Sequence, residues 1–446
     1  MSLTLLLPFT GNAQSGSITL QDALKLALTN NQSIAISRYE EQIGEQQIIQ
    51  ARSRALPQVN LNGNFTDNYK RQVLVLPAGT FGGSASDKPS TIVAGTLYST
   101  SLGVDASQAL IDPAVFTALK AAQGSSDYYK LNTKQTEEDV IRQTAQAYYG
   151  ILASREQIVV QDSNISRLNR IITATEGQYK AGLARKIDLD RIRVSLTNAQ
   201  TLRLQQLNQV SARTNELKML MGVAIETDIT PADISLREIE TRAATYIPAE
   251  SFDLNSRTEI RVLDEQINLA GLQAKSIRAE NYPKLSAFVN YSGNAVSNGF
   301  SDLFTSGGQD VGYGMGSFGL RLNVPVFDGF ARQSRTRQAT IQGLELRKRR
   351  EATALSLAAG FSNARYQMAS NVSAIAAQKQ NVQLAESVYN ASQTNYNLGL
   401  ASLTDLLDAQ NSFIQAQNSF TQALLDYKIA ELETIRATGN LRSLLQ

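Results

Sequence analysis

Histidine, cysteine and tryptophan are absent from the 446 residues of this chain. Without cysteine it can form no disulfide, no thiolate nucleophile, no zinc–sulfur site and no cysteine-borne lipid anchor. Without histidine it lacks the commonest general base and the commonest metal ligand. We therefore expect no catalytic residues, no metal site and no cofactor, and we interpret the chain as something other than an enzyme.

Excess charge of one sign is also lacking. The chain carries 42 Lys and Arg against 40 Asp and Glu, a formal net charge of +2. Phosphate binding needs a concentrated basic face, so we expect no nucleic acid partner. No apolar run approaches the ~18–20 residues of a membrane-spanning helix. If the protein crosses a membrane, we expect it to do so as strands.

The N-terminus resembles the tail of an export signal. A short apolar run at 3–9 precedes the small residues of 11–14, a pattern typical of signal-peptidase cleavage. We interpret residues 1–17 as a probable signal-peptide remnant. A basic segment before the apolar run is missing, so an ordinary disordered terminus stays open as the alternative.

Proline is scarce and unevenly placed. No proline occurs between Pro113 and Pro231 or after Pro325, and both stretches are rich in strong helix formers. Two expected helices exceed 60 residues and would each be about 100 Å long, which favours coiled-coil-like packing over a compact globule. The expected helices cover residues 18–56, 113–177, 184–222, 254–281, 328–395 and 402–440.

Between the helices the sequence alternates with period two. Apolar residues such as Leu61 and Val289 alternate with Asn, Ser and Thr, which predicts strands with one apolar and one polar face. We expect two hairpins, with strands at about 57–70 and 97–111 and at about 283–297 and 312–327. The polar face suits a wet lumen and the apolar face suits lipid. A soluble hairpin with one face on a protein core remains the alternative.

The chain is a tandem duplication. The run Tyr179-Lys-Ala-Gly-Leu-Ala returns as Tyr396-Asn-Leu-Gly-Leu-Ala at an offset of 217, as do Asp188-Leu and Asp405-Leu. We expect repeat 1 at 18–222, a connector at 223–253 and repeat 2 at 254–446. The first hairpin loop, 71–96, is longer than its counterpart and is expected to be an exposed loop.

Four strands cannot close a barrel, and an open sheet edge cannot lie in lipid. If the strands cross a membrane, several copies of the chain must share one barrel. The expected fold class is therefore a mixed α+β membrane protein. It combines a long antiparallel, coiled-coil-like helical tunnel with four transmembrane β-strands per chain.

The sequence resembles a known family, the TolC family of outer-membrane efflux proteins. The resemblance rests on the tandem halves, the strand entries at Leu56-Pro57 and Tyr282-Pro283, and the duplicated Tyr-x-x-Gly-Leu-Ala-x-x-x-Asp-Leu turn. The opening segment at 18–24 is similar too, and the match covers residues 18–440.

The resemblance implies a homotrimer that shares a twelve-stranded β-barrel in the outer membrane of a Gram-negative-type cell. The helices would extend into the periplasm. The implied partners are a periplasmic adaptor (membrane fusion) protein, an inner-membrane transporter and outer-membrane lipid. The implied function is the exit duct of a tripartite efflux or type I secretion system.

The resemblance also suggests gate residues. Asp405 and Asp408 lie one helical turn apart on one helix face, and in the family two aspartates at these positions form a selectivity ring at the tunnel entrance. Carboxylates that converge in a trimer would favour cations and have raised pKa values. Tyr396 and Asp188 match a tyrosine and an aspartate that hold the family's tips closed by hydrogen bonds. An arginine of the family's best-known examples is replaced here by Ala401. Either the closed state is held more loosely, or another group such as Arg185 or Lys186 compensates.

The two turns themselves are candidate contacts for the adaptor. Similar turns in the family meet the adaptor's hairpin, and small residues permit close helix approach. The alternative is that the turns are kept only for their geometry. The expected contact residues are Gly182, Leu183, Ala184, Gly399, Leu400 and Ala401.

Two other functions stay open on the sequence alone. An exported, soluble coiled-coil scaffold or adaptor-like protein would pack its strand faces on protein instead of lipid. An enzyme that uses paired carboxylates, such as a glycosidase, would need a concave pocket, which long proline-free helices do not offer.

Overall fold

A computed structural model describes residues 17–77, 89–232, 236–244, 252–301 and 311–445. The expected signal remnant at 1–17 lies almost wholly outside these residues. The chain divides into two compact units, and each unit draws on both sequence repeats. We call residues 43–127 and 266–345 the sheet unit. The remainder, 1–42, 128–265 and 346–446, is the helical unit.

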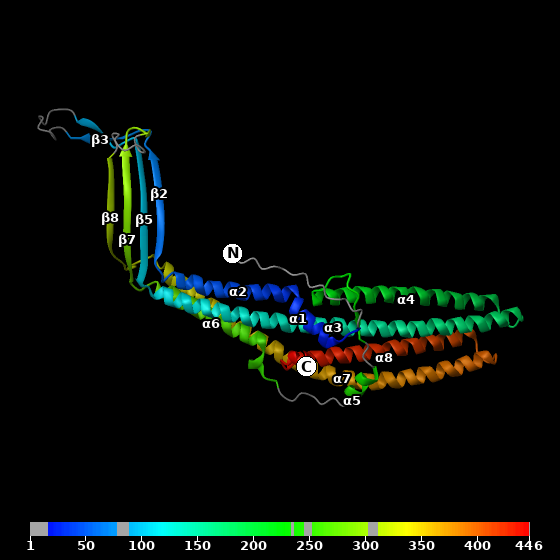
Figure 1. Ribbon diagram of the computed structural model, residues 1–446. Coiled ribbons are helices and arrows are strands. Elements are labelled where there is room, and N and C mark those ends of the chain that lie inside the picture. The colour runs from blue at the N-terminus through cyan, green and yellow to red at the C-terminus, as the bar shows by residue number, and fades with distance from the viewer. Residues whose placement is uncertain (1–16, 78–88, 233–235, 245–251, 302–310, 446) are drawn as a thin grey trace. The chain divides into compact units, whose positions relative to one another are not determined.

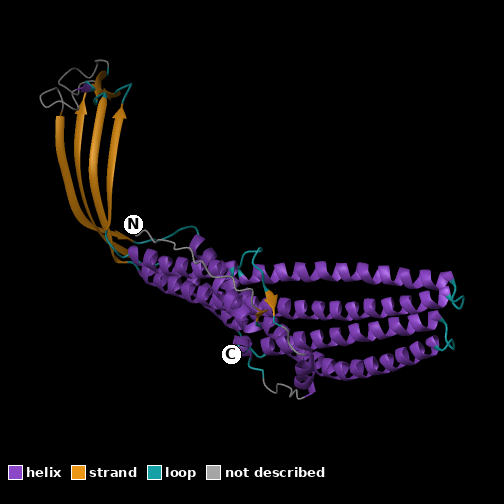
Figure 2. Ribbon diagram, turned by 45° about the vertical axis from the view of Figure 1, so that its right-hand side comes forward, coloured by secondary structure: helices purple, strands orange, loops and turns teal. Residues whose placement is uncertain are grey.

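The sheet unit contains one four-stranded antiparallel sheet (Figures 1 and 2). Its strands are β2 (Gln58–Asp67), β5 (Tyr98–Ile111), β7 (Lys284–Ser297) and β8 (Val311–Asn323), in the order β2-β5-β7-β8. The pairing of β5 with β7 joins the hairpin of the first repeat to the hairpin of the second. The expected combination of long helices with four strands is thus confirmed.

The strand register sorts the residues into two faces. Asn60, Asp105, Asn290 and Ser317 lie in one row across the four strands. The next row, on the opposite face because side chains alternate along a strand, contains Leu61, Val104, Tyr291 and Gly316. One face is therefore polar and the other apolar, as the period-two pattern predicts.

The polar face is tied together by side chains. The Nδ2 atom of Asn60 donates to Asp105 at 3.1 Å, and Asn62 donates to the other carboxylate oxygen. Phe288, which breaks the alternation, lies on this face beneath the guanidinium of Arg321, 5.2 Å from the ring centroid. Gly319 leaves room for it, because a Cβ there would approach the Phe288 ring to 3.1 Å.

The loop expected at 71–96 is structured at both ends. Strands β3 (Gln72–Leu76) and β4 (Ser90–Ala94) form a separate antiparallel hairpin. Val73, Val75, Ile92 and Val93 supply the β-branched residues that favour strands. The expected exposed loop thus contains a hairpin that was not predicted from the sequence, and its side chains, such as Val73 and Val75, are exposed. Residues 78–88 lie outside the described part of the chain.

The long helices on either side of the two reversals run side by side in the helical unit, and both reversals lie at the same end (Figures 1 and 2). They belong to α3 (Pro113–Lys180), α4 (Lys186–Met221), α7 (Ala331–Asn397) and α8 (Leu403–Ala437). Near the reversals all four contribute to one buried apolar cluster. It includes Leu168 of α3, Ile192 of α4, Tyr389 of α7 and Leu406 of α8.

The helix expected at 18–56 is broken into α1 (Leu20–Asn30) and α2 (Gln32–Ser53). Asn31 causes the break: its Oδ1 accepts from the backbone N–H of Ser33, and its Nδ2 donates to the carbonyl of Leu220 at 2.8 Å. An asparagine that caps the next helix in this way competes with helix continuation. Gly222 at the end of α4 permits this close approach. Any other residue would place its Cβ 2.3 Å from the Asn30 carbonyl oxygen.

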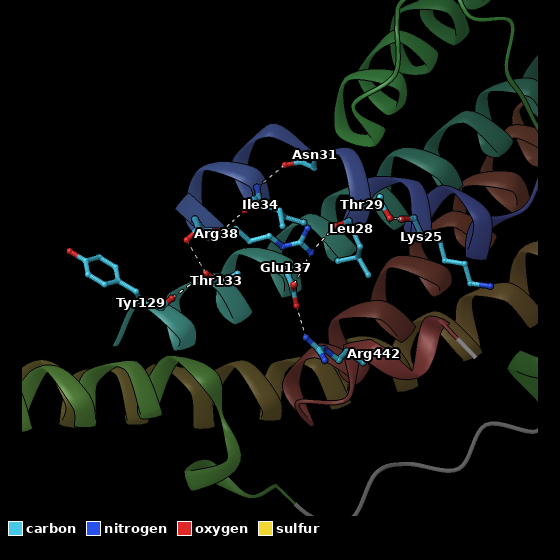
Figure 3. Close-up of polar contacts among 11 residues, drawn as sticks. Lys25, Leu28, Thr29, Asn31, Ile34, Arg38, Tyr129, Thr133, Glu137 and Arg442 are labelled. Atoms are coloured by element: carbon cyan, nitrogen blue, oxygen red, sulfur yellow. Dashed lines mark hydrogen bonds and ion pairs between the residues drawn. The ribbon is translucent and has the colours of Figure 1, made fainter. Parts of the chain in front are cut away.

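The two ends of the described chain meet at α3 (Figure 3). Arg38 of α2 lies 3.5 Å from Glu137 of α3, and Arg442 of the short C-terminal helix η3 (Leu441–Leu445) donates to the same carboxylate. Glu137 therefore links segments near the two ends of the described chain to one long helix.

Strand β1 (Ser17–Ile18) pairs in parallel with β6 (Thr230–Pro231) of the connector.

The remaining helices are short. Helix α5 (Leu236–Ala244) packs Ile239 and Ala243 into an apolar cluster with Met368 and Tyr427. A single turn, η1 (Leu254–Ser256), precedes α6 (Thr258–Ala279). Within the described residues, no helix is both long enough and apolar enough to cross a membrane.

Candidate functional site

The two helix reversals have the same backbone. Gly182 and Gly399 adopt φ values of +72° and +75°, a left-handed conformation that glycine reaches without strain. In the first turn the N–H of Leu183 bonds to the carbonyl of Gln178 at 2.8 Å, and in the second Leu400 bonds to Asn395 at 2.8 Å. These are Schellman motifs, which satisfy the last carbonyls of α3 and α7.

Both turns expose an apolar side chain after the glycine. Leu183 is 82% exposed and Leu400 is 76% exposed, whereas Ala184 and Ala401 are half-buried. A Cβ added to either glycine would meet open space. The geometry explains the glycines completely, but it gives no internal reason for a leucine at the most exposed position of each turn.

Asp188 lies in the first turn of α4 and is engaged by Arg185. The Nε and Nη2 atoms of Arg185 donate to the two carboxylate oxygens at 3.0 and 3.2 Å. This bidentate hydrogen bonding lowers the pKa of Asp188 below its ordinary value. Arg185 is one of the two residues that the sequence offered in place of the missing arginine. It forms its hydrogen bonds with Asp188 in the same turn.

Asp405 occupies the equivalent place in α8 but has a different partner. Its carboxylate accepts from the backbone N–H and the hydroxyl of Ser402 at 3.0 and 2.7 Å, and the Ser402 Oγ accepts from the Asp405 N–H at 3.2 Å. This is a capping box. The hydrogen bonds from Ser402 lower the pKa of Asp405. The direction is opposite to that expected for carboxylates converging in a trimer, because in the single chain the hydrogen bonds from Ser402 dominate.

Asp408 lies one turn further along α8 and is exposed. Its backbone carbonyl accepts from the Ser412 hydroxyl at 2.9 Å, and no partner of its carboxylate is found among the described residues. Of the two predicted gate carboxylates, Asp405 therefore caps a helix, and Asp408 has a carboxylate without such a role.

Tyr396 bonds to a residue that the sequence did not single out. Its hydroxyl lies 3.0 Å from the Thr175 Oγ1 on α3. Tyr396 and Asp188, the two residues that match the family's closing residues, thus have separate partners: Tyr396 bonds to Thr175, and Asp188 bonds to Arg185. The bond to Thr175 joins the α7–α8 pair to the α3–α4 pair.

A second bond joins the same helix pairs. Arg191 of α4 donates from Nη1 to the Thr404 Oγ1 of α8 at 3.3 Å.

The spacing of Ser402 and Asp405 could have predicted the capping box from the sequence alone. Thr175 and Thr404 carried no such signal, because threonines on helix surfaces are common and only the packing of two helix pairs brings them to their partners.

The two turns differ in charge. The segment 176–193 carries five basic and three acidic residues, whereas the equivalent segment 393–410 carries only Asp405 and Asp408. The described residues contain no group of three or more acidic side chains placed to hold a metal ion. The site is thus a pair of matched helix reversals with opposite charge. The bonds Tyr396–Thr175 and Arg191–Thr404 join the helix pairs beside the turns, and Gln410 of α8 donates to Asn164 of α3 further along the same helices.

The chain is similar to known outer-membrane channels. The model of the family described as "Outer membrane efflux protein" matches residues 23–223 and 253–440. Outer membrane protein TolC of Escherichia coli is 22% identical over 437 residues, which are 95% of this chain and 82% of that protein. Alkaline protease secretion protein AprF of Pseudomonas aeruginosa is 21% identical over 325 residues, 73% of this chain and 64% of that protein.

A solved structure has the same fold. The outer membrane channel CmeC of Campylobacter jejuni superposes with a TM-score of 0.74 at 15% identity, covering 98% of this chain and 90% of that one. The family match spans both repeats, and the chain shares the fold of that solved channel, with long helices and an antiparallel sheet. The chain therefore belongs to the outer membrane efflux protein family and serves as an exit duct in the outer membrane.

Proposed function

We propose that three copies of this chain assemble into one twelve-stranded barrel, continued by their helices as a periplasmic tunnel. The sheet carries this proposal. Within the described residues, β2 and β8 each pair on one side only, and an open edge is not tolerated in lipid. Copies that join β8 of one chain to β2 of the next satisfy both edges.

The two faces of the sheet support the same arrangement. Val59, Leu61, Phe318, Leu320 and Leu322 are all between 64% and 86% exposed in the single chain. So much apolar surface needs a covering, and lipid supplies it on the outside of a barrel. The opposite face, with Asn60, Asp105 and Asn290, then lines the water-filled lumen.

Asp405 and Asp408 form the selectivity ring of the closed entrance in this proposal. They are the only charged residues in segment 393–410, so no nearby cation of that segment neutralises them. Three copies would bring six carboxylates to the entrance. Such a ring attracts cations and repels anions.

Within each chain, the bonds Tyr396–Thr175 and Arg191–Thr404 hold the two helix pairs together. We infer that they form the latch of the closed state. A hydrogen bond of this kind contributes about 0.5–1.5 kcal/mol. A few such bonds per chain suffice to close the entrance and remain weak enough to be broken by a docking partner.

The exposed leucines support docking of a periplasmic adaptor at the tips, with an inner-membrane transporter behind it. Leu183 and Leu400 have no internal role, and the glycines beside them permit close approach of another helix. The cargo is a separate matter: AprF is named for protease secretion and CmeC for a channel. Both efflux and type I secretion fit the proposed duct.

Assembly and conduction can be tested on one sample. We expect the detergent-solubilised protein to have the mass of three chains by light scattering and to give cation-selective conductance in a planar bilayer. Recovery of a monomer from the aqueous fraction without detergent would instead support the exported coiled-coil scaffold.

A further inference from the structure

A cavity of about 580 Å³ lies in the sheet unit where β8 passes into α7. It is lined on one side by Arg278 and Asn281 at the end of α6, and on another by Arg332 and Arg337 in the first turns of α7. Val326, Phe327 and Phe330 complete its wall. The cavity thus combines three guanidinium groups with an apolar rim at one end of the sheet.

The arginines are not balanced by acids. Among the lining residues the only carboxylate is that of Asp328, which is bound to the Nε of Arg332 at 2.6 Å. Arg332 is also buried and donates to the Glu280 carbonyl at 3.2 Å. Arg278 and Arg337 are exposed, and no ion-pair partner for either is found in the described part of the chain. Two guanidinium groups therefore remain for an anion from outside.

The rim is apolar and points outward. Val326 is 90% exposed, Phe327 is 73% exposed and Phe330 is 67% exposed, and the two rings meet edge to face at 5.5 Å. Phe330 adopts φ +67°, which costs a bulky residue about 1–2 kcal/mol. The apolar residues Leu320, Leu322, Val324 and Val326 occupy alternate positions leading to this rim, so the rim continues the apolar face of β8.

The α7 side of this cavity has no counterpart in the first repeat, whereas on the α6 side Arg278 corresponds to Arg52 when Pro283 is aligned with Pro57. With the offset of 216 that relates Asp112 to Asp328, the counterparts of Arg332 and Arg337 are Phe116 and Ala121. The counterparts of Phe327 and Phe330 are Ile111 and Ala114. The cluster of arginine and phenylalanine is therefore not a requirement of the shared strand-to-helix turn.

We propose that this cavity binds the phosphate headgroup of an anionic phospholipid in the membrane leaflet nearest the helices, with the acyl chains along Val326, Phe327 and the apolar face of β8. Guanidinium groups match phosphate oxygens in geometry as well as charge. The apolar rim explains why the ligand is a lipid and not a free anion. The proposal rests on the membrane position proposed above for the sheet.

The test measures lipid that co-purifies with the full-length protein from an equimolar mixture of phosphatidylglycerol and phosphatidylcholine in detergent. We expect wild type to retain phosphatidylglycerol in excess. Arg278→Gln with Arg337→Gln should lower that excess about tenfold, because two charge-assisted contacts to phosphate are lost. The matched control is Arg52→Gln with Arg54→Gln, which removes equal charge at the end of α2, just before β2. It should change the excess by no more than about twofold.

Phe327→Ala separates a lipid from a free anion. It should lower retention of both phospholipids while keeping their ratio, and inorganic phosphate should fail to displace the bound lipid. An unchanged ratio in the double arginine variant, an equal loss in the control, or ready displacement by phosphate would each overturn the proposal. Light scattering on the same samples keeps the two proposals apart. A wild-type trimer without phosphatidylglycerol excess refutes only the lipid site, whereas a monomer refutes the barrel.

Discussion

The turn after α3 and the turn after α7 share one backbone and differ in almost every charge. Both end in a Schellman motif around a left-handed glycine and expose a leucine. Yet the first binds its aspartate by an arginine and the second by a serine. Duplication thus preserved the features that reverse a helix and left the charged positions free to diverge.

This difference has a consequence for the entrance of the tunnel. In the first turn the arginine neutralises Asp188, whereas in the second Asp405 keeps its full charge beside the exposed Asp408. The same sequence position therefore contributes a neutral ion pair in one half and a net negative charge in the other. We expect any cation preference of the proposed entrance to arise from the second half, because segment 176–193 carries an excess of two basic residues.

Removing the charges of the second turn should have the largest effect. Asp405→Asn with Asp408→Asn should abolish cation preference, a change of about tenfold in the permeability ratio, because the carboxylate ring is lost. The measurement is the reversal potential in a planar bilayer under a salt gradient. Arg185→Gln with Asp188→Asn removes the neutral ion pair at the equivalent position and is the control in the first turn. A comparable loss in the control would show that both halves contribute.

Removing the bond between Tyr396 and Thr175 should change the open probability of the channel, whereas the equivalent substitution in the first turn should not. Tyr396→Phe removes the bond to Thr175 and should raise the open probability about fivefold per chain, as expected for the loss of about 1 kcal/mol. Tyr179, its counterpart, is 44% exposed and has no hydroxyl partner among the described contacts, so Tyr179→Phe should have no effect. Single-channel recording checks both variants. Equal open probabilities would assign Tyr396 to packing.

The shared backbone should respond equally in both turns. Gly182→Ala and Gly399→Ala should each destabilise the local turn by about 1 kcal/mol, because alanine is strained at positive φ. Neither substitution meets a neighbouring atom, so strain is the only expected cost. Hydrogen exchange of the amides at the ends of α3 and α7 measures this. Unequal effects would show that the turns differ in more than side chains.

The smallest effect concerns the two lowered pKa values. Arg185→Gln should raise the pKa of Asp188 and leave that of Asp405 unchanged. Ser402→Ala should raise the pKa of Asp405 and leave that of Asp188 unchanged. Because both pKa values are lowered by folding, each carboxylate stabilises its helix start above about pH 4. That stabilisation is lost as the pH falls through the lowered pKa. Carboxyl carbon-13 shifts measure both.

Salt separates the two carboxylates further. Added salt screens the exposed pair of Arg185 and Asp188 more than the neutral hydroxyl bond of Ser402. The pKa of Asp188 should therefore rise with ionic strength while that of Asp405 changes less. Identical salt dependence would contradict the assignment of different partners.

Much of the architecture could be predicted from the sequence because it depends on short-range patterns. Proline-free stretches marked α3, α4, α7 and α8, and period-two alternation marked the four strands. The break at Asn31 was missed because one asparagine within a long helical pattern is a weak signal. The local cap to Ser33 is reinforced by a bond to Leu220, which is 189 residues away in the sequence. The hairpin of β3 and β4 was missed because glycine and serine in the same loop outweighed a few β-branched residues.

The sequence by itself determined the duplicated halves, the reversing glycines, the two faces of the strands and the excess of acid in the second turn, since all of these follow from the order of neighbouring residues. Only the tertiary structure decided which groups meet. It paired Tyr396 with Thr175 and Arg191 with Thr404, and it gathered Arg278, Arg332 and Arg337 around one cavity. Such contacts join segments far apart in the chain, and no local pattern encodes the packing that brings them within the 3 Å or so of a hydrogen bond.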